Sequence, residues 1–125
     1  MKMALDSATG LHLVAAYTPG LVTLNTRQSF EQSIIVFPDK LHTDWGVVSV
    51  EEIRPKDYAP IFEYKPELLI IGTGDTQIFP HPRTFIDLID MNIGYEIMDN
   101  SAACRTFNIL MGEGRKASLA LIMPQ

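Results

Sequence analysis

The sequence predicts an α/β fold: a single domain in three layers, with helices packed on a mixed central sheet and an N-terminal β-hairpin as an additional layer. Two observations predict this class. In the second half of the 125-residue chain, apolar strand-like runs alternate with helix-like segments, a pattern that produces parallel strands joined by right-handed crossovers. In the first half, strand-like runs follow one another with no helix between them, which favours antiparallel or mixed pairing.

The first half begins with the predicted hairpin. Its strands are residues 11–17 and 21–25, and residues 18–20 read Thr-Pro-Gly. Proline presets one backbone angle of a tight turn and glycine permits the next, so this tripeptide predicts the turn. Residues 33–37 form a continuous apolar run that predicts a strand buried on both faces. We expect a further strand over residues 45–50.

The next segments alternate between helix and strand. We predict a short helix over residues 56–62 and a buried central strand over residues 68–71, directly before a pair of glycines. Residues 81–91 have proline in the first turn and apolar residues at helical spacing, which predicts an amphipathic helix. Gly94 is expected to end it. Its expected buried side chains are Phe85, Leu88 and Ile89.

The last third predicts a strand, a long helix and a final strand. The strand covers residues 95–98, and the side chains of residues 99–101 offer acceptors that can cap a helix starting at about Ala102. Residues 116–123 form the last strand, with alternate side chains on its two faces. The expected buried stripe of the helix is Ala103, Phe107, Leu110 and Met111.

The composition is that of a globular protein and argues against a nucleic-acid-binding one. Hydrophobic residues make up 46% and charged residues 20% of the chain, as in an ordinary globular protein with one core. No repeat or long linker divides the sequence, so we expect residues 1–125 to form one domain. The net charge of −5 argues against a nucleic-acid partner, because such affinity comes mainly from clustered Lys and Arg.

The single cysteine and the lengths of the apolar runs indicate the cellular compartment of the protein. Cys104 is alone, so no intrachain disulfide forms, and no paired cysteines have zinc spacing. No run approaches the roughly 20 apolar residues of a membrane span, and residues 1–9 lack the apolar stretch of a signal peptide. We therefore expect a cytoplasmic protein with no metal, no cofactor and no membrane span.

The first candidate for chemistry is the turn Gly72, Thr73, Gly74, Asp75. Open α/β sheets place ligands beyond the carboxyl ends of their parallel strands, where this turn is expected. The third glycine of a dinucleotide fingerprint and the Walker lysine are absent. An ordinary tight turn and an anion-binding loop both remain open. His81 and Arg83 could add base and anion contacts, although a histidine beside prolines is more often a solvated cap.

A second candidate lies in the predicted C-terminal helix and the turn that follows it. Arg105 and Asn108 share a helical face at i, i+3 spacing, and this face meets a partner or lines a pocket. Glu113 and Arg115 form a charged turn. Cys104 has no matching base in the sequence, so we expect a buried or inert thiol and not a nucleophile.

Several of these segments resemble one family. The resemblance also includes the early hairpin with Trp45 and Gly46, and it covers nearly the whole chain. The segments that carry it are residues 66–74, 98–99, 102–110 and 113–115. They resemble the Mth-type domain family, which includes the mitochondrial respiratory complex I assembly factor 3 and the adipogenesis-associated Mth-type domain protein.

The resemblance implies a three-layer α/β fold, no established reaction or cofactor, and work through protein contacts. It also implies a shared surface. The positions that match this surface are Gly72, Thr73, Gly74, Arg105, Asn108, Glu113 and Arg115.

Three functional hypotheses follow. The first is a non-catalytic cytoplasmic interaction protein that assists assembly of a membrane-associated complex through an unidentified protein partner. The second is a small-molecule or anion site, or an enzyme, that uses a pocket between the Gly72 to Asp75 turn and Arg105. The third is a homo-oligomer that buries an apolar rim around Phe62, Tyr64 and Phe79. The lack of a complete catalytic set argues against an enzyme, without deciding the question.

Overall fold

The computed structural model describes residues 10–124. The first strands of this part of the chain form a small antiparallel sheet. The predicted hairpin is confirmed: β1 (Val14–Thr18) pairs with β2 (Leu21–Leu24). Gly20, in the turn between them, has a φ of +83°, which only glycine adopts without strain. A short third strand that the sequence did not predict, β3 (Ser29–Phe30), pairs with β2.

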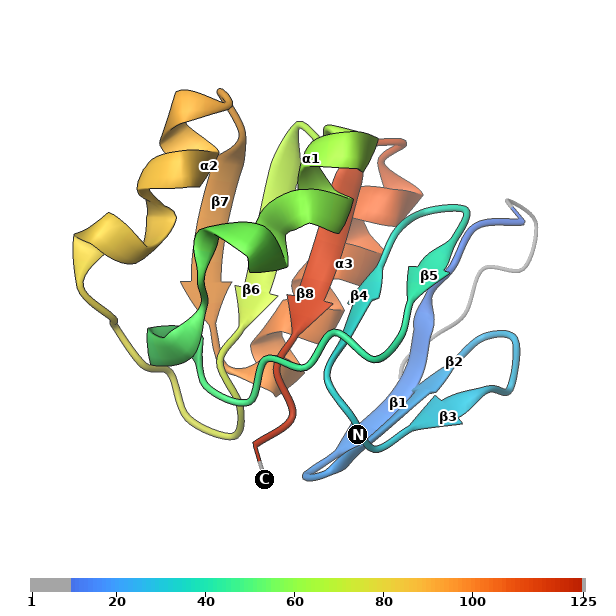
Figure 1. Cartoon of the computed structure of the whole chain (residues 1–125). Coiled ribbons are helices and arrows are strands. Elements are labelled where there is room, and N and C mark those ends of the chain that lie inside the picture. The colour runs from blue at the N-terminus through green and yellow to red at the C-terminus, as the bar shows by residue number, and fades with distance from the viewer. Residues whose placement is uncertain (1–9, 125) are drawn as a thin grey trace.

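A five-stranded mixed sheet forms the centre of the molecule (Figure 1). β6 is parallel to both β7 and β8, whereas β4 runs antiparallel to β8 and β5, in the order β5-β4-β8-β6-β7. This arrangement confirms the prediction of parallel crossovers in the second half and antiparallel pairing in the first. The strands are β4 (Ile34–Val36), β5 (Leu41–His42), β6 (Leu68–Gly72), β7 (Gly94–Met98) and β8 (Ala117–Leu121).

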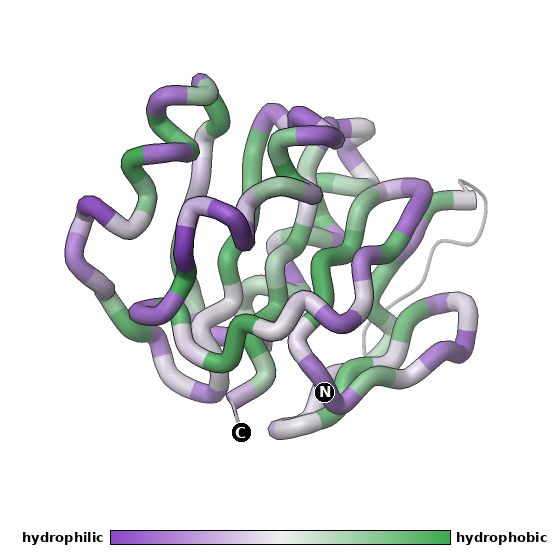
Figure 2. Tube along the Cα trace, viewed as in Figure 1, coloured by the Kyte–Doolittle hydropathy of each residue, from purple (hydrophilic) through white to green (hydrophobic). Residues whose placement is uncertain are grey.

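Helices and the small sheet cover the two faces of the central sheet, giving three layers (Figure 1). α1 (Ala59–Tyr64) and α2 (Ile86–Asp90) lie on one face, and α3 (Asn100–Gly112) lies with β1 and β2 on the other. Figure 2 shows hydrophobic segments in the interior strands and hydrophilic segments in the outer turns.

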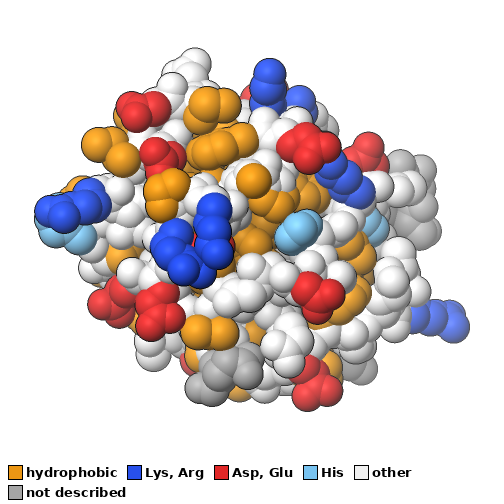
Figure 3. Space-filling view, viewed as in Figure 1, with side chains coloured by type: hydrophobic (Ala, Val, Ile, Leu, Met, Phe, Trp, Pro, Cys, Tyr) orange, Lys and Arg blue, Asp and Glu red, His pale blue; other side chains and the backbone are white. Residues whose placement is uncertain are grey.

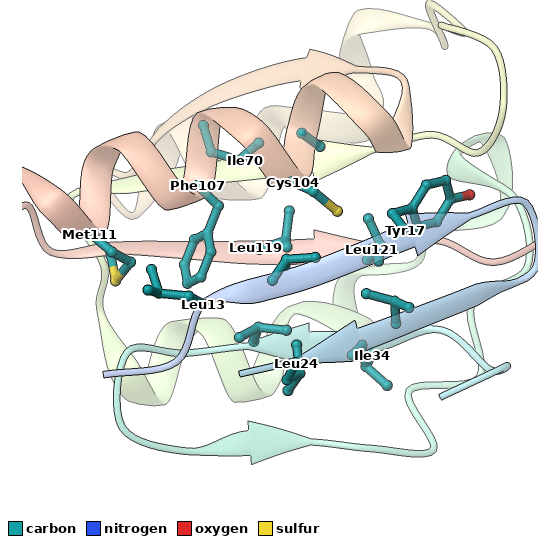
Figure 4. Packing of buried hydrophobic residues seen from close by; sticks show 14 of the residues in the cluster. Leu13, Tyr17, Leu24, Ile34, Ile70, Cys104, Phe107, Met111, Leu119 and Leu121 are labelled. Atoms are coloured by element: carbon teal, nitrogen blue, oxygen red, sulfur yellow. The ribbon is translucent and has the colours of Figure 1, made fainter. Parts of the chain in front are cut away.

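Alternate side chains of β8 pack into two separate hydrophobic cores, one on each face of the sheet. Ala117, Leu119 and Leu121 pack towards α3 and β1, and Ala120 packs towards α1 and α2. Figure 4 shows Leu119 and Leu121 in the first of these cores. This alternation is the one that the sequence predicted. The predicted stripe of α3 is also confirmed, since each of its four side chains is buried.

The prediction of a strand over residues 45–50 is wrong. This segment has no strand pairing and ends in a 3-10 turn (Val50–Glu52). Two features explain the difference. Gly46 has a φ of +81°, which breaks an extended backbone. The Trp45 indole donates to the Asp57 carbonyl oxygen at 2.8 Å, so the segment is fixed by side-chain bonds. β5 takes the free edge of β4 in its place.

Two predictions about the helix over residues 81–91 are also wrong. Gly94 does not end it: the helix stops at Asp90, Asn92 adopts a φ of +60°, and Gly94 is the first residue of β7. Ile89 is 59% exposed, whereas Leu88 is buried. The segment starts as a 3-10 turn (Pro82–Phe85) with three residues per turn, so a phase calculated for a continuous α-helix points Ile89 to the wrong side.

Asn108 fastens the small sheet to α3. Its side-chain Oδ1 accepts a hydrogen bond from the Val14 backbone N–H, and its Nδ2 donates to the Val14 carbonyl oxygen, both at 2.9 Å. Val14 lies at the irregularity in the β1–β2 register. The asparagine therefore satisfies backbone groups of a strand that has no other neighbour on that side within residues 10–124.

Replacing Asn108 with alanine should lower the free energy of unfolding by about 2 kcal/mol, because two partly buried backbone groups lose their partners. Urea denaturation monitored by the single tryptophan measures this. Ile109→Gln, at an exposed neighbouring position, is the control and should change stability by less than about 0.5 kcal/mol. Equal effects of the two substitutions would contradict the fastening role.

Candidate functional site

A buried asparagine organises the edge of the sheet at which the parallel strands end. Asn100 opens α3 and is fully buried. Its Oδ1 accepts from the Gly74 N–H at 2.9 Å, and its Nδ2 donates to the Ile122 carbonyl oxygen at 2.9 Å and to the Tyr17 hydroxyl at 3.0 Å. One side chain thus joins the turn after β6, the end of β8 and the end of β1. We call these four residues the Asn100 hub.

The two glycines of the predicted turn are required by packing. A Cβ at Gly72 would collide with the Asn100 Oδ1 and would lie 2.9 Å from the Leu121 Cδ1. Gly74 has a φ of +113°, and a Cβ there would lie 2.8 Å from the Pro124 Cγ. Side chains of the protein itself therefore fill the space above this turn.

The polar residues of the turn bond within the protein. The Thr73 hydroxyl donates to the Thr76 carbonyl oxygen at 2.6 Å and accepts from the Ile78 N–H at 3.1 Å. Asp75 is exposed and accepts from the Tyr17 hydroxyl at 3.0 Å. Burial raises the pKa of Tyr17 to about 12, the bond from Asn100 lowers it, and the Asp75 carboxylate adds to the rise.

The other predicted surface residues lie elsewhere. Arg105 is exposed on α3 beside Ile109, on the side opposite the buried Cys104 and Phe107. Asn108 faces Val14. Asn108 is thus engaged with the small sheet, whereas Arg105 is exposed on α3.

Glu113 and Arg115 follow the far end of α3 (Figure 1). The Arg115 Nε lies 3.9 Å from the Glu67 Oε2, close to the amino end of β6. The 13 residues of α3 span roughly 20 Å at 1.5 Å per residue. This distance separates the charged turn from the Asn100 hub.

The candidate nucleophile and bases have structural surroundings. Cys104 is buried, and this burial raises the pKa of its thiol to about 12, although Arg105 lowers it in part. Its thiolate is thus disfavoured at neutral pH, as the sequence led us to expect. The His81 Nδ1 accepts from the Arg83 N–H at 3.1 Å and caps the turn before α2. The His12 Nδ1 donates to the Phe37 carbonyl oxygen at 2.8 Å.

The three aromatic residues of the predicted rim do not form one surface. Tyr64 packs on Phe37 with ring centroids 4.7 Å apart, and Phe62 packs on Tyr58 at 5.7 Å. Phe79 is 76% exposed in the loop that precedes α2. Only Phe79 therefore presents most of its ring to solvent.

An apolar surface that the sequence did not predict surrounds α2. Large hydrophobic side chains gather over α2 on the face shown in Figure 3. On α2 and directly after it, these are Ile86, Ile89 and Met91, each at least 44% exposed. We call these three residues the α2 surface. The helix starts as a 3-10 turn, which places its isoleucines on the outer side. No local pattern in the sequence predicts this 3-10 start.

A groove adjoins the α2 surface. It has a volume of about 800 Å³ and runs between the residues around Arg54 and the start of α2. Its walls combine apolar and charged side chains, among them Ile53, Arg54, Arg83, Ile86 and Asp87. Such mixed lining is common at protein interfaces, where an apolar centre meets a polar rim.

Residues 10–124 contain neither a metal-binding cluster nor a membrane-spanning helix. This part of the chain contains no group of three or more His, Cys, Asp or Glu side chains placed to hold a metal ion. Within the same residues, no helix combines the length and the apolar character needed to cross a membrane.

The layered architecture and the mixed sheet define the class of protein. A solution structure from Bordetella pertussis, described as a Mth938-like domain, superposes with a TM-score of 0.78 at 30% identity, covering 98% of this chain and 92% of that one. A crystal structure from Bordetella parapertussis gives a TM-score of 0.82 at 34% identity, covering 94% and 99%. Residues 14–122 match the family described as protein of unknown function (DUF498/DUF598), and the chain belongs to that family.

Named relatives include assembly factors and a membrane protein. NADH dehydrogenase [ubiquinone] 1 alpha subcomplex assembly factor 3 of Mus musculus is 33% identical over 82 residues, 64% of this chain and 44% of the relative. The Danio rerio protein of that name is 30% identical over 90% of this chain and 64% of its own length. The 13 kDa major membrane protein of Francisella tularensis is 24% identical over 85% of this chain and 86% of its own. The chain thus spans about half the length of the mammalian relatives.

Gly72→Ala should lower the free energy of unfolding by about 2–3 kcal/mol, because the added methyl group overpacks against the buried Asn100. Gly112→Ala is the matched control. A Cβ at Gly112 meets nothing within 4 Å, so this change should be neutral or stabilising by up to about 1 kcal/mol. Chemical denaturation compares the two, and a neutral Gly72→Ala would contradict the packing argument.

Tyr17→Phe should cost about 1–2 kcal/mol at pH 7, where the hydroxyl bonds to Asn100 and Asp75. It should also flatten the alkaline loss of stability. The unfolded chain releases the tyrosine proton near pH 10, whereas the folded protein holds it to about 12, so stability falls as the pH rises through this window.

Urea titrations between pH 8 and about 11.5 measure the slope of that decline. Burial also raises the pKa of Tyr58, so Tyr17→Phe should reduce the slope without abolishing it. Parallel curves for the wild-type protein and the variant would show that Tyr17 titrates normally in the folded state.

Proposed function

We propose that this protein is a non-catalytic interaction factor that assists the assembly of a membrane-associated complex. Support comes from relatives that are named complex I assembly factors and that are 33% and 30% identical to this chain over the matched residues. The chain matches 44% of the length of the Mus musculus relative. We also propose the cytoplasm as its place of action.

The α2 surface is the observation that carries this proposal. Ile86 and Ile89 lie one turn apart on α2 and are 53% and 59% exposed, and Met91, directly after α2, is 44% exposed. Burying such side chains against a partner gains about 25 cal/mol for each Å² of apolar area removed from water. Neighbouring exposed apolar side chains of this size typically mark an interface.

The alternative, a small-molecule or anion site at the Gly72 turn, has less support. The Gly74 N–H, which could bind an anion, already donates to Asn100. Arg105 lies on the outer side of α3. The crevice that open α/β sheets use for ligands is thus occupied by the Asn100 hub.

Crosslinking capture from the native host tests the proposal. The wild-type protein should retain a reproducible partner, and the double variant Ile86→Ser/Ile89→Ser should retain about tenfold less, because two interface anchors are lost. Leu21→Ser, at a 40% exposed position on β2, is the matched control and should capture as the wild type does. Equal capture by all three proteins, or no reproducible partner, would overturn the proposal.

A further inference from the structure

The outer edge of β7 is unpaired within residues 10–124. β7 ends the five-stranded sheet and pairs only with β6. The Gly94 N–H donates to the Glu67 carbonyl oxygen at 3.1 Å, and the Thr73 N–H donates to the Met98 carbonyl oxygen at 3.0 Å. Successive residues of a strand point their backbone N–H and C=O groups to opposite edges. The backbone groups of Glu96, like those of Gly94 and Met98, therefore face β6. The backbone groups of Tyr95 and Ile97 therefore point away from the sheet.

One of these outward groups is capped by a side chain. The Ile97 carbonyl oxygen accepts from the Nε2 of Gln77, an exposed residue, at 3.0 Å. The Tyr95 N–H, the Tyr95 carbonyl oxygen and the Ile97 N–H have no such partner within residues 10–124. Two donors and one acceptor thus stand at the spacing that an added strand needs, and removal of Gln77 would supply the second acceptor.

The two faces of β7 differ in chemistry. Tyr95 and Ile97 project to the α2 side, where they pack half-buried in the same core as Phe85 and Leu88. That side continues into the exposed isoleucines of the α2 surface. Glu96 projects to the other side and is exposed. A strand added to β7 would therefore meet apolar side chains on one face and a carboxylate on the other.

We propose that the outer edge of β7 binds an extended segment of a partner protein, with a lysine or arginine opposite Glu96 and apolar side chains at the alternate positions. The inference rests on the proposed function and names the chemistry of the partner. A second copy of this chain fits less well. Antiparallel self-pairing centred on Glu96 sets two carboxylates directly opposite each other, which is destabilising, and each chain has a net charge of −5.

Gln77 limits access to this edge. Its Nε2 occupies the Ile97 carbonyl oxygen that an incoming strand must use. Docking therefore displaces this bond, and Gln77→Ala should strengthen binding by about threefold to tenfold. This direction discriminates strand addition from docking on the helix alone, which would leave the effect of Gln77→Ala near zero.

Peptide titration followed by NMR tests the inference. The probes are a short end-capped peptide of alternating valine and lysine and a matched peptide with glutamate in place of lysine. The lysine peptide should shift the amide signals of Tyr95 and Ile97 and bind about twofold to fivefold more tightly than the glutamate peptide. Glu96→Lys should reverse that preference, and its unchanged spectrum elsewhere would show that it folds.

The outcomes separate this inference from the proposed function. If neither peptide shifts Tyr95 and Ile97 while Ile86→Ser/Ile89→Ser still loses its captured partner, strand docking is overturned and the interaction role stands. Shifts that show no charge preference, or a preference that Glu96→Lys leaves unchanged, also overturn it. A dimeric mass in sedimentation, with the Tyr95 and Ile97 amides protected from exchange, would assign the edge to a second copy.

Discussion

The buried Asn100 side chain is the constraint on which the rest of the structure depends. A primary amide in an apolar core costs several kcal/mol unless its hydrogen bonds are made. Here the amide bonds to Gly74, Ile122 and Tyr17, which come from three separate parts of the chain. Each bond fixes one segment against another, so the turn after β6, the last strand and the small sheet hold one arrangement. Gly72 follows from this, because only glycine leaves room for the amide.

The same constraint closes the carboxyl edge of the sheet, where open α/β sheets usually bind ligands. An open crevice there would offer backbone N–H groups and a carboxylate to a ligand. In this protein the Gly74 N–H donates to the Asn100 side chain, and the Asp75 carboxylate accepts from the Tyr17 hydroxyl. What the fold leaves exposed is an apolar helix, a groove beside it and the edge of β7. These exposed features carry the interaction role that we propose.

Patterns confined to a few neighbouring residues predicted most of the fold. The apolar runs of β4, β6 and β8 and the stripe of α3 were predicted because burial alone decides them. The family resemblance is confirmed by the matched family and by solved Mth938-like structures.

The role of Asn100 was not predictable, because its partners lie 26 and 83 residues away. The exposed α2 isoleucines were missed because a 3-10 turn shifted the helix phase. For the role of Asn100, the one available signal in the sequence was the pair Gly72 and Gly74 followed by an asparagine after the next strand.

Hydrogen exchange of the Asn100 side-chain amide, measured by NMR, tests the central claim most directly. If this amide closes the carboxyl edge as described, its Nδ2 hydrogens should exchange only through global unfolding, as slowly as the most protected backbone amides of β6 and β8. Exchange within seconds under native conditions would contradict the account, because it would show that the edge opens to water while the rest of the sheet stays folded.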